Sequence, residues 1–220
     1  MDLEKLEQEA KKEYLKIGTS HDWEHILRVK NNAKIIGQKE DADLNIILPA
    51  AILHDLGRLS GKEKKHSQDT TIAKKILNTA QYNEILANKI VNCIKTHSYD
   101  EEIQPETLEA KVVFDADKID SYGFLGVARF FSLTGEEHLS INEAISNAFE
   151  RISALGKIGG FLTKTGKEIG FKKVKRSIIF YYLLMKELGN SKNAQKIESL
   201  VKEKFGEQTV LELKTIGDKI

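Results

Sequence analysis

The stretch LNIILPAAILHDLG, residues 44–57, is the most apolar in the chain and decides the fold. Apolar side chains occur nearly all round a helix drawn through Leu44–Leu56, so we expect a buried helix here that Gly57 ends. Pro49 lies inside this segment and marks either the first turn of a shorter helix or a kink. With no run of alternating strand residues elsewhere, the sequence predicts an all-α protein.

Apolar residues recur at helical spacing through most of the remaining chain. The stripes are Ile26, Val29, Ala33 and Ile36; Ala73, Ile76 and Leu77; Leu86, Ile90, Cys93 and Ile94; and Phe171, Val174, Ile178, Tyr181, Met185 and Leu188. A mobile or tightly turned connection is predicted by the glycines before the last stripe, which are Gly156, Gly159, Gly160, Gly166 and Gly170. We expect one domain over residues 1–220, with core motifs at 20–130 and C-terminal helices at 140–220 packed on it.

The composition fits a globular protein and excludes several classes. Of the 220 residues, 40% are apolar and 30% are charged, which argues against disorder. Basic and acidic residues balance at 34 and 33, so nothing favours nucleic acid in general, and the basic cluster at 172–176 lies on the polar side of a helix. Cys93 is the single cysteine, which excludes an internal disulfide and a cysteine zinc site.

Two features predict a cytoplasmic protein without membrane segments. Met1–Lys16 carries acidic and basic residues at close spacing and lacks the apolar stretch of a signal peptide. The longest apolar run, Ile178–Met185, is far shorter than the ~20 residues that span a bilayer. The aromatic stripe at 171–182 could bury against the core or against a second copy in a homo-oligomer.

The first candidate for chemistry is the pair His54-Asp55 at the end of the apolar helix. A buried carboxylate without a partner is very costly, so Asp55 needs a strong one. A divalent metal would serve, because an imidazole nitrogen beside a carboxylate oxygen suits Mn, Fe, Zn or Ni. The dipeptide alone also fits a histidine at a helix C-terminus followed by a capping aspartate.

His25 is the second candidate, on the same helix face as Val29. A single histidine there is more often a hydrogen-bonded core residue than a ligand. His21 precedes it by one turn, and two histidines at this spacing can bind zinc. Since the further ligand and general base of such a pair are not evident, we interpret His21 as supporting the site or capping a turn.

The segment FDADKID, residues 114–120, supplies further carboxylates. Asp117 and Asp120 share an otherwise apolar helix face, which is hard to explain as solvated surface. The pattern fits a face on which one carboxylate binds a metal and the other orients a ligand or a bound water. Asp115 points elsewhere and is expected to pair with a lysine or to cap a turn.

Two more histidines lie at the ends of expected helices. His66 opens the helix after the loop 58–65, and His97 ends the helix that runs from Asn83. Both continue an apolar stripe to the end of an element, where pockets tend to form. We therefore count both as candidate site residues.

Taken in order, His25, His54-Asp55 and Asp117 resemble the ligand pattern of the HD-domain metal-dependent phosphohydrolases. The chain is also similar to one bacterial subgroup, which includes small nucleotide pyrophosphohydrolase-like proteins, and this likeness covers most of its length. The similar segments are Ser20-His21-Asp22-Trp23, Arg28-Val29, His54-Asp55-Leu56-Gly57, Asp115–Asp120, Gly123, Gly126, Ala128-Arg129 and Thr165–Leu188.

The resemblance implies a helical bundle that holds one divalent cation (Mn, Mg, Fe, Co, Ni or Zn) between helices. Its implied ligands are His25, His54, Asp55 and Asp117. Related families with additional histidines bind two metals, and His66 and His97 occupy comparable places. A paired histidine is absent, because Ser98 follows His97, which argues against a second metal that shares Asp55. His66 and His97 are therefore assigned to the substrate side of the site or to proton transfer.

The implied mechanism uses a metal that polarises a phosphoryl oxygen and lowers the pKa of a bound water. Asp120, His66 or His97 would guide that water or protonate the leaving oxygen. Negative charge on the phosphoryl oxygens calls for fixed cations, and the candidates are Arg58, Lys62, Lys65, Lys118 and Arg28. Each could equally be a surface charge, and Arg58 is favoured because it directly follows the HD turn.

The predicted function is hydrolysis of a phosphate ester or anhydride in a small phosphorylated molecule, above all a nucleotide, including conversion of a nucleoside triphosphate to the monophosphate. Two alternatives stay open. One is a phosphomonoesterase or cyclic-nucleotide phosphodiesterase on the same scaffold, and the other is a regulatory module that binds metal or nucleotide without catalysis. All four ligands are present, which argues against the regulatory module, since a degenerate protein would be expected to have lost one.

Overall fold

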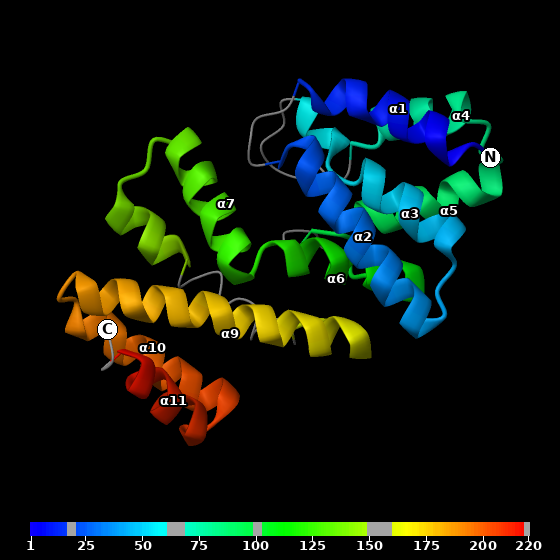
Figure 1. Ribbon diagram of the computed structural model, residues 1–220. Coiled ribbons are helices and arrows are strands. Elements are labelled where there is room, and N and C mark those ends of the chain that lie inside the picture. The colour runs from blue at the N-terminus through cyan, green and yellow to red at the C-terminus, as the bar shows by residue number, and fades with distance from the viewer. Residues whose placement is uncertain (17–20, 61–68, 99–102, 149–159, 218–220) are drawn as a thin grey trace. The chain divides into compact units, whose positions relative to one another are not determined.

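The computed structural model describes residues 1–16, 21–60, 69–98, 103–148 and 160–217 (Figure 1). These residues contain helices and irregular segments but no β-strand, which confirms the all-α prediction. The named elements are α1 (Leu3–Tyr14), α2 (Trp23–Glu40), α3 (Leu44–Leu53), the 3₁₀ helix η2 (Leu56–Ser60), α4 (Thr71–Thr79), α5 (Glu84–Lys95), α6 (Leu108–Asp120), α7 (Gly123–Glu136), α9 (Lys164–Glu187), α10 (Ser191–Phe205) and α11 (Glu207–Gly217).

The chain divides into two compact units. The first unit comprises Met1–Ser121 with Phe161–Gly170, and the second comprises Tyr122–Gly160 with Phe171–Ile220. The single domain over 1–220 stays a prediction. No helix in the described ranges is both long and apolar enough to cross a membrane.

Helix α2 forms where the sequence predicts it, with the capping residues at both ends explained by local chemistry. The carboxylate of Asp22 accepts the backbone N–H of His25 at 2.9 Å, which satisfies a donor that the first turn would leave unpaired. The helix ends at Glu40, and the capping residue Asp41 lies in the left-handed region with φ 59°, where its N–H donates to the Gly37 carbonyl. The predicted stripe from Ile26 to Ile36 is fully buried.

Helix α3 ends at Leu53, so the expected end at Gly57 was wrong. The next α-helical bond would join the Asp55 N–H to the Ala51 carbonyl. Instead, the Asp55 N–H donates to the Tyr14 hydroxyl at 3.3 Å, and the Ala51 carbonyl accepts Nδ1 of His54 at 2.8 Å. The chain then continues through Asp55 into η2.

Pro49 lies within α3, whose first residue is Leu44, so it does not mark the start of a shorter helix. The helix begins behind Asp43, whose side chain accepts the Asn45 N–H at 2.8 Å. All residues from Pro49 to Leu53 are buried, which agrees with the apolar character on every face. The two largest aliphatic side chains among them, Ile52 and Leu53, each contribute about 1.5–3 kcal/mol when fully buried.

The core of the first unit lies where α2, α3, α5 and α6 meet (Figure 1). Helix α2 packs on α6 and on α3, and α3 packs also on α5. The amide of Asn32 on α2 donates to the Ala116 carbonyl on α6 at 3.1 Å. These contacts bring the ends of α3 and α5 and one face of α6 beside the first turn of α2.

Two of the glycines expected in a mobile or tightly turned connection, Gly166 and Gly170, lie inside α9 instead. A Cβ added to Gly166 would stand 2.1 Å from Oδ2 of Asp115, and one added to Gly170 would stand 2.1 Å from the Phe161 ring. These glycines therefore allow close approach of the helix to its neighbours. Gly156 and Gly159 lie outside the described residues.

The second unit contains α7, helical residues 141–148, most of α9, and α10 with α11. The predicted stripe on α9 is buried from Val174 to Met185, and its two ends, Phe171 and Leu188, are exposed. Helix α10 contributes Ile197 and Val201 to the buried residues of this unit.

Candidate metal centre

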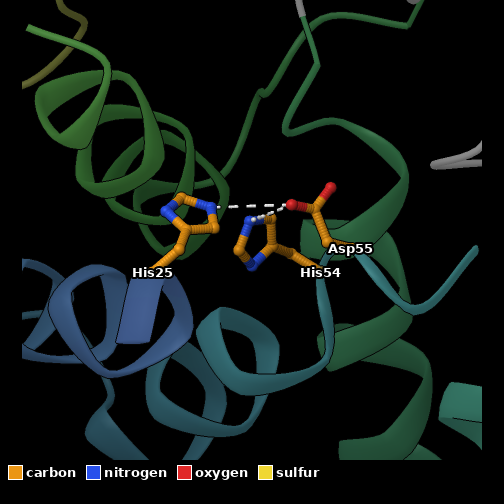
Figure 2. A group of neighbouring side chains, drawn as sticks. All are labelled: His25, His54 and Asp55. Atoms are coloured by element: carbon orange, nitrogen blue, oxygen red, sulfur yellow. Dashed lines mark ion pairs between the residues drawn. The ribbon is translucent and has the colours of Figure 1, made fainter. Parts of the chain in front are cut away.

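Side chains from four parts of the first unit converge on one buried point. His25 comes from the first turn of α2, and His54 with Asp55 follows α3 (Figure 2). Oδ2 of Asp55 lies 3.5 Å from Nε2 of His25 and 3.3 Å from Nε2 of His54. All three side chains are at most 2% exposed, so water hardly reaches this point.

Asp117 and His97 complete the cluster. Oδ1 of Asp117, on α6, lies 3.6 Å from Nε2 of His25 and 3.8 Å from Nε2 of His54. Nε2 of His97, just after α5, lies 3.8 Å from the other Asp55 oxygen, Oδ1. Two overlapping groups among the described residues could hold a metal ion, one formed by His25, His54 and Asp55 and the other by His54, His97 and Asp117.

Each of the three histidines is oriented through its Nδ1 atom. Nδ1 of His25 donates to Oδ2 of Asp120 at 2.8 Å, and those of His54 and His97 donate to backbone carbonyls at 2.8 and 2.6 Å. Carboxylates and carbonyls accept hydrogen bonds, so Nδ1 carries the hydrogen in each ring. Nε2 therefore presents its lone pair to the cluster, as a metal ligand does.

Nε2 of His54 supports a metal at this point. It is buried without a hydrogen-bond partner among the described residues, an arrangement that is costly unless something else contacts the atom. Imidazole nitrogens with carboxylate oxygens form a donor set suited to Mn, Fe, Zn or Ni. The residues present thus fit a divalent cation that contacts His54 and its neighbours.

The buried carboxylates are each paired with a cation. Nε of Arg58 donates to Oδ1 of Asp55 at 2.8 Å, and Nζ of Lys118 donates to Oδ2 of Asp117 at 2.9 Å. Nε of Arg28 donates to Oδ1 of Asp120 at 2.9 Å. These pairs offset the cost of burying the negative charges.

The electrostatics favour ionised carboxylates at this point. Burial by itself raises the pKa of Asp55, but the guanidinium of Arg58 brings it well below its ordinary value. For Asp117, burial again raises the pKa, and the ammonium of Lys118 lowers it well below the usual range. Burial, with His54 nearby, lowers the pKa of His97 to about 3. Two anionic carboxylates beside a neutral imidazole attract a cation.

The structure brings the four predicted ligands together, and it brings Asp120, His97, Arg28, Arg58 and Lys118 beside them. Asp120 contacts His25 and Arg28. His66, Lys62 and Lys65 lie outside the described residues. His21 belongs to neither candidate metal group, and its ring meets the His25 ring edge-on with 5.8 Å between centroids.

Sequence reasoning missed the part played by Tyr14 and the partners of Asp115. Tyr14 is 1% exposed and accepts the Asp55 N–H. The spacing of Leu6, Ala10 and Tyr14 along one face of α1 could have indicated that Tyr14 is buried. Asp115 accepts the backbone N–H groups of Leu162 and Thr163, which lie 47 and 48 residues further along the chain.

The chain is similar in sequence to one known protein family and to a bacterial protein. The HD domain family matches residues 22–122 of this chain. YpgQ of Bacillus subtilis (strain 168) is 31% identical to it over 121 residues, which make up 53% of this chain and 58% of YpgQ. The match therefore spans less than two thirds of that relative.

Solved structures share the helical fold. A structure of Bacillus subtilis YpgQ in complex with ADP has a TM-score of 0.69 and 24% identity, and the match covers 84% of this chain and 97% of that one. The Lin1889 protein from Listeria innocua has a TM-score of 0.63 and 27% identity, covering 86% and 98%. An HD-superfamily hydrolase from Bacillus thuringiensis has a TM-score of 0.65 and 23% identity, covering 85% and 96%.

Proposed function

We propose that the protein is a metal-dependent phosphohydrolase acting on a nucleotide. The match of residues 22–122 to the HD domain family supports the proposal, because hydrolase activity with a divalent metal is what that resemblance implies. The finer parts of the proposal are the ligands His25, His54, Asp55 and Asp117, and a phosphate ester or anhydride as the bond that is cleaved.

One observation carries the proposal: the buried Nε2 of His54 has no hydrogen-bond partner among the described residues, and it faces Asp55 and Asp117. A purely structural cluster would be expected to satisfy this atom from within the protein. A divalent cation would instead contact it together with the carboxylate oxygens. The Nδ1 bonds of His25 and His54 hold both rings in the orientation that this requires.

When bound, a divalent metal at such a site polarises a phosphoryl oxygen and supplies hydroxide from water near neutral pH. The chain's own residues prepare that chemistry. Asp120 holds the ring of His25, and Arg58 holds the carboxylate of Asp55. His97 directs Nε2 to the same cluster, where its proposed role is to accept a hydrogen bond that orients a bound water.

Substrate recognition is assigned to the partly exposed cations. The side chains of Arg58 and Arg28 are 33% and 31% exposed although each donates through Nε to a buried carboxylate. Their remaining guanidinium N–H groups could therefore contact the phosphate oxygens of a substrate. A nucleotide is proposed as the substrate because the relative YpgQ has been solved in complex with ADP.

The test is release of phosphate and pyrophosphate from a panel of nucleotides and phosphate esters, with added Mn, Mg, Co or Ni. The Asp55→Ala variant is assayed in parallel. We expect metal-dependent release by the natural chain and none by the variant, and the product identifies a pyrophosphohydrolase or a phosphatase. Equal release by both proteins would contradict the assignment of Asp55, and no release from any compound would favour a binding module.

A further inference from the structure

The start of α9 is bound by carboxylates from the two helices that carry the metal centre. Asp115 on α6 accepts the N–H of Leu162 through Oδ1 at 2.8 Å and the N–H of Thr163 through Oδ2 at 2.7 Å. Glu40, the last residue of α2, accepts the N–H of Thr165 at 2.5 Å. These contacts satisfy backbone donors that a helix start leaves unpaired, and they tie α2 and α6 to one segment.

Thr163 links the carboxylate of Asp115 to the first turn of α9. Its hydroxyl donates to Oδ2 of Asp115 at 2.6 Å and accepts the N–H of Gly166 at 2.9 Å. Only glycine fits at position 166 without displacing Asp115, because a Cβ there would be 2.1 Å from Oδ2 of that residue. Asp115 is 0% exposed, so water does not compete for these bonds.

Asp115 faces away from the metal centre. It precedes Asp117 by two residues, which places the two side chains about 200° apart around the helix axis. One face of α6 thus contacts the histidines through Asp117 and Asp120, and the opposite face is bound to the start of α9. A rotation of α6 that moved Asp117 away from His25 would have to break the bonds of Asp115.

We infer that Asp115 and Thr163 form a positioning contact that holds α6 in the orientation the metal centre requires. This inference rests on the proposed function, because it assumes that Asp117 is a metal ligand. The segment that supplies the contact, Phe161–Gly170, lies outside the residues that match the HD domain family, so the metal centre depends on a part of the chain beyond that domain.

The first experiment compares Thr163→Val with Thr163→Ser. Valine removes the hydroxyl that Asp115 and Gly166 share, and serine keeps it. The Kd for Mn²⁺ and the visible absorption spectrum of the Co²⁺-loaded protein are measured on each full-length chain. We expect Thr163→Val to weaken Mn²⁺ binding by up to about tenfold, the lower end of the range for partners of metal ligands, and to alter the Co²⁺ spectrum. Thr163→Ser should retain both properties.

A second pair of variants separates positioning from general loss of stability. Gly166→Ala adds a methyl group against Oδ2 of Asp115 and should displace that carboxylate, with the same effect on the Co²⁺ spectrum as Thr163→Val. Val201→Ala opens a cavity in α10 of the second unit, where Val201 is 1% exposed. It should lower the melting temperature and leave the Co²⁺ spectrum unchanged.

The possible results distinguish this inference from the proposed function. If the natural chain binds metal, and Thr163→Val and Gly166→Ala bind it with unchanged Kd and spectrum, the positioning contact is refuted while the function stands. If Val201→Ala shifts the spectrum as much as Thr163→Val does, stability rather than position is responsible, and the inference also fails. If the natural chain binds no divalent metal, both proposals fail.

Discussion

Among the residues that the structure describes, the first unit buries charged side chains and the second does not. Among the described residues, eight Asp, His and Lys side chains are buried in the first unit, namely His25, His54, Asp55, His97, Asp115, Asp117, Lys118 and Asp120. The buried polar side chains of the second unit are those of Thr134 and Ser177, which bond to nearby backbone groups. One unit thus contains a costly polar centre, and the other is held by apolar packing.

This difference assigns metal binding to the first unit and apolar stabilisation to the second. Buried charges reduce stability unless each has a partner, and the first unit supplies those partners through Arg28, Arg58 and Lys118. The described core of the second unit, around Met185, buries no histidine and no carboxylate. Substitutions in the first unit should therefore change metal affinity, and those in the core of the second unit should change the free energy of unfolding.

The largest effect is expected from His54→Ala. Removal of an imidazole at the centre of the cluster should weaken metal binding by more than about 100-fold, beyond the loss caused by a ligand's outer partner. The helical circular dichroism signal should persist. Metal content after dialysis measures the loss, and His138→Asn, at an exposed histidine of the second unit, is the matched control. Full metal content in His54→Ala would refute the assignment of this ligand.

The next largest effect is expected from Met185→Ala on α9, because this side chain is 0% exposed in the second unit. Truncation of a buried methionine costs about 2–5 kcal/mol through lost contacts and the cavity left behind. Urea denaturation should show this loss, while the Kd for Mn²⁺ of the folded protein stays unchanged. A change in that Kd would show that packing in the second unit also affects metal binding.

A smaller effect is expected from Asp120→Asn. The amide oxygen can still accept Nδ1–H of His25, but the negative charge that strengthens the bond and pairs with Arg28 is lost. Metal affinity should fall by about tenfold, as for other partners of metal-bound histidines. Isothermal titration with Mn²⁺ measures the change. Asp43→Asn is the matched control, because asparagine also caps a helix. Equal affinities in both variants would show that Asp120 does not support His25.

The sequence by itself determined the helical class, the HD pair and the carboxylates of α6. Helical periodicity and the spacing of Asp117 and Asp120 are local properties of the sequence, so they do not depend on which helix packs against them. The order of His25, His54-Asp55 and Asp117 then gave the resemblance to the HD-domain proteins, and the HD domain family matches residues 22–122.

Only the tertiary structure decided where α3 ends and which groups surround the centre. The Asp55 N–H leaves the helix for the hydroxyl of Tyr14, 41 residues earlier, and His97 reaches the cluster because α5 packs on α3. Asp115 finds its partners at Leu162 and Thr163. Contacts between residues so far apart leave no periodic trace in the chain, because they depend on how helices pack rather than on neighbouring residues.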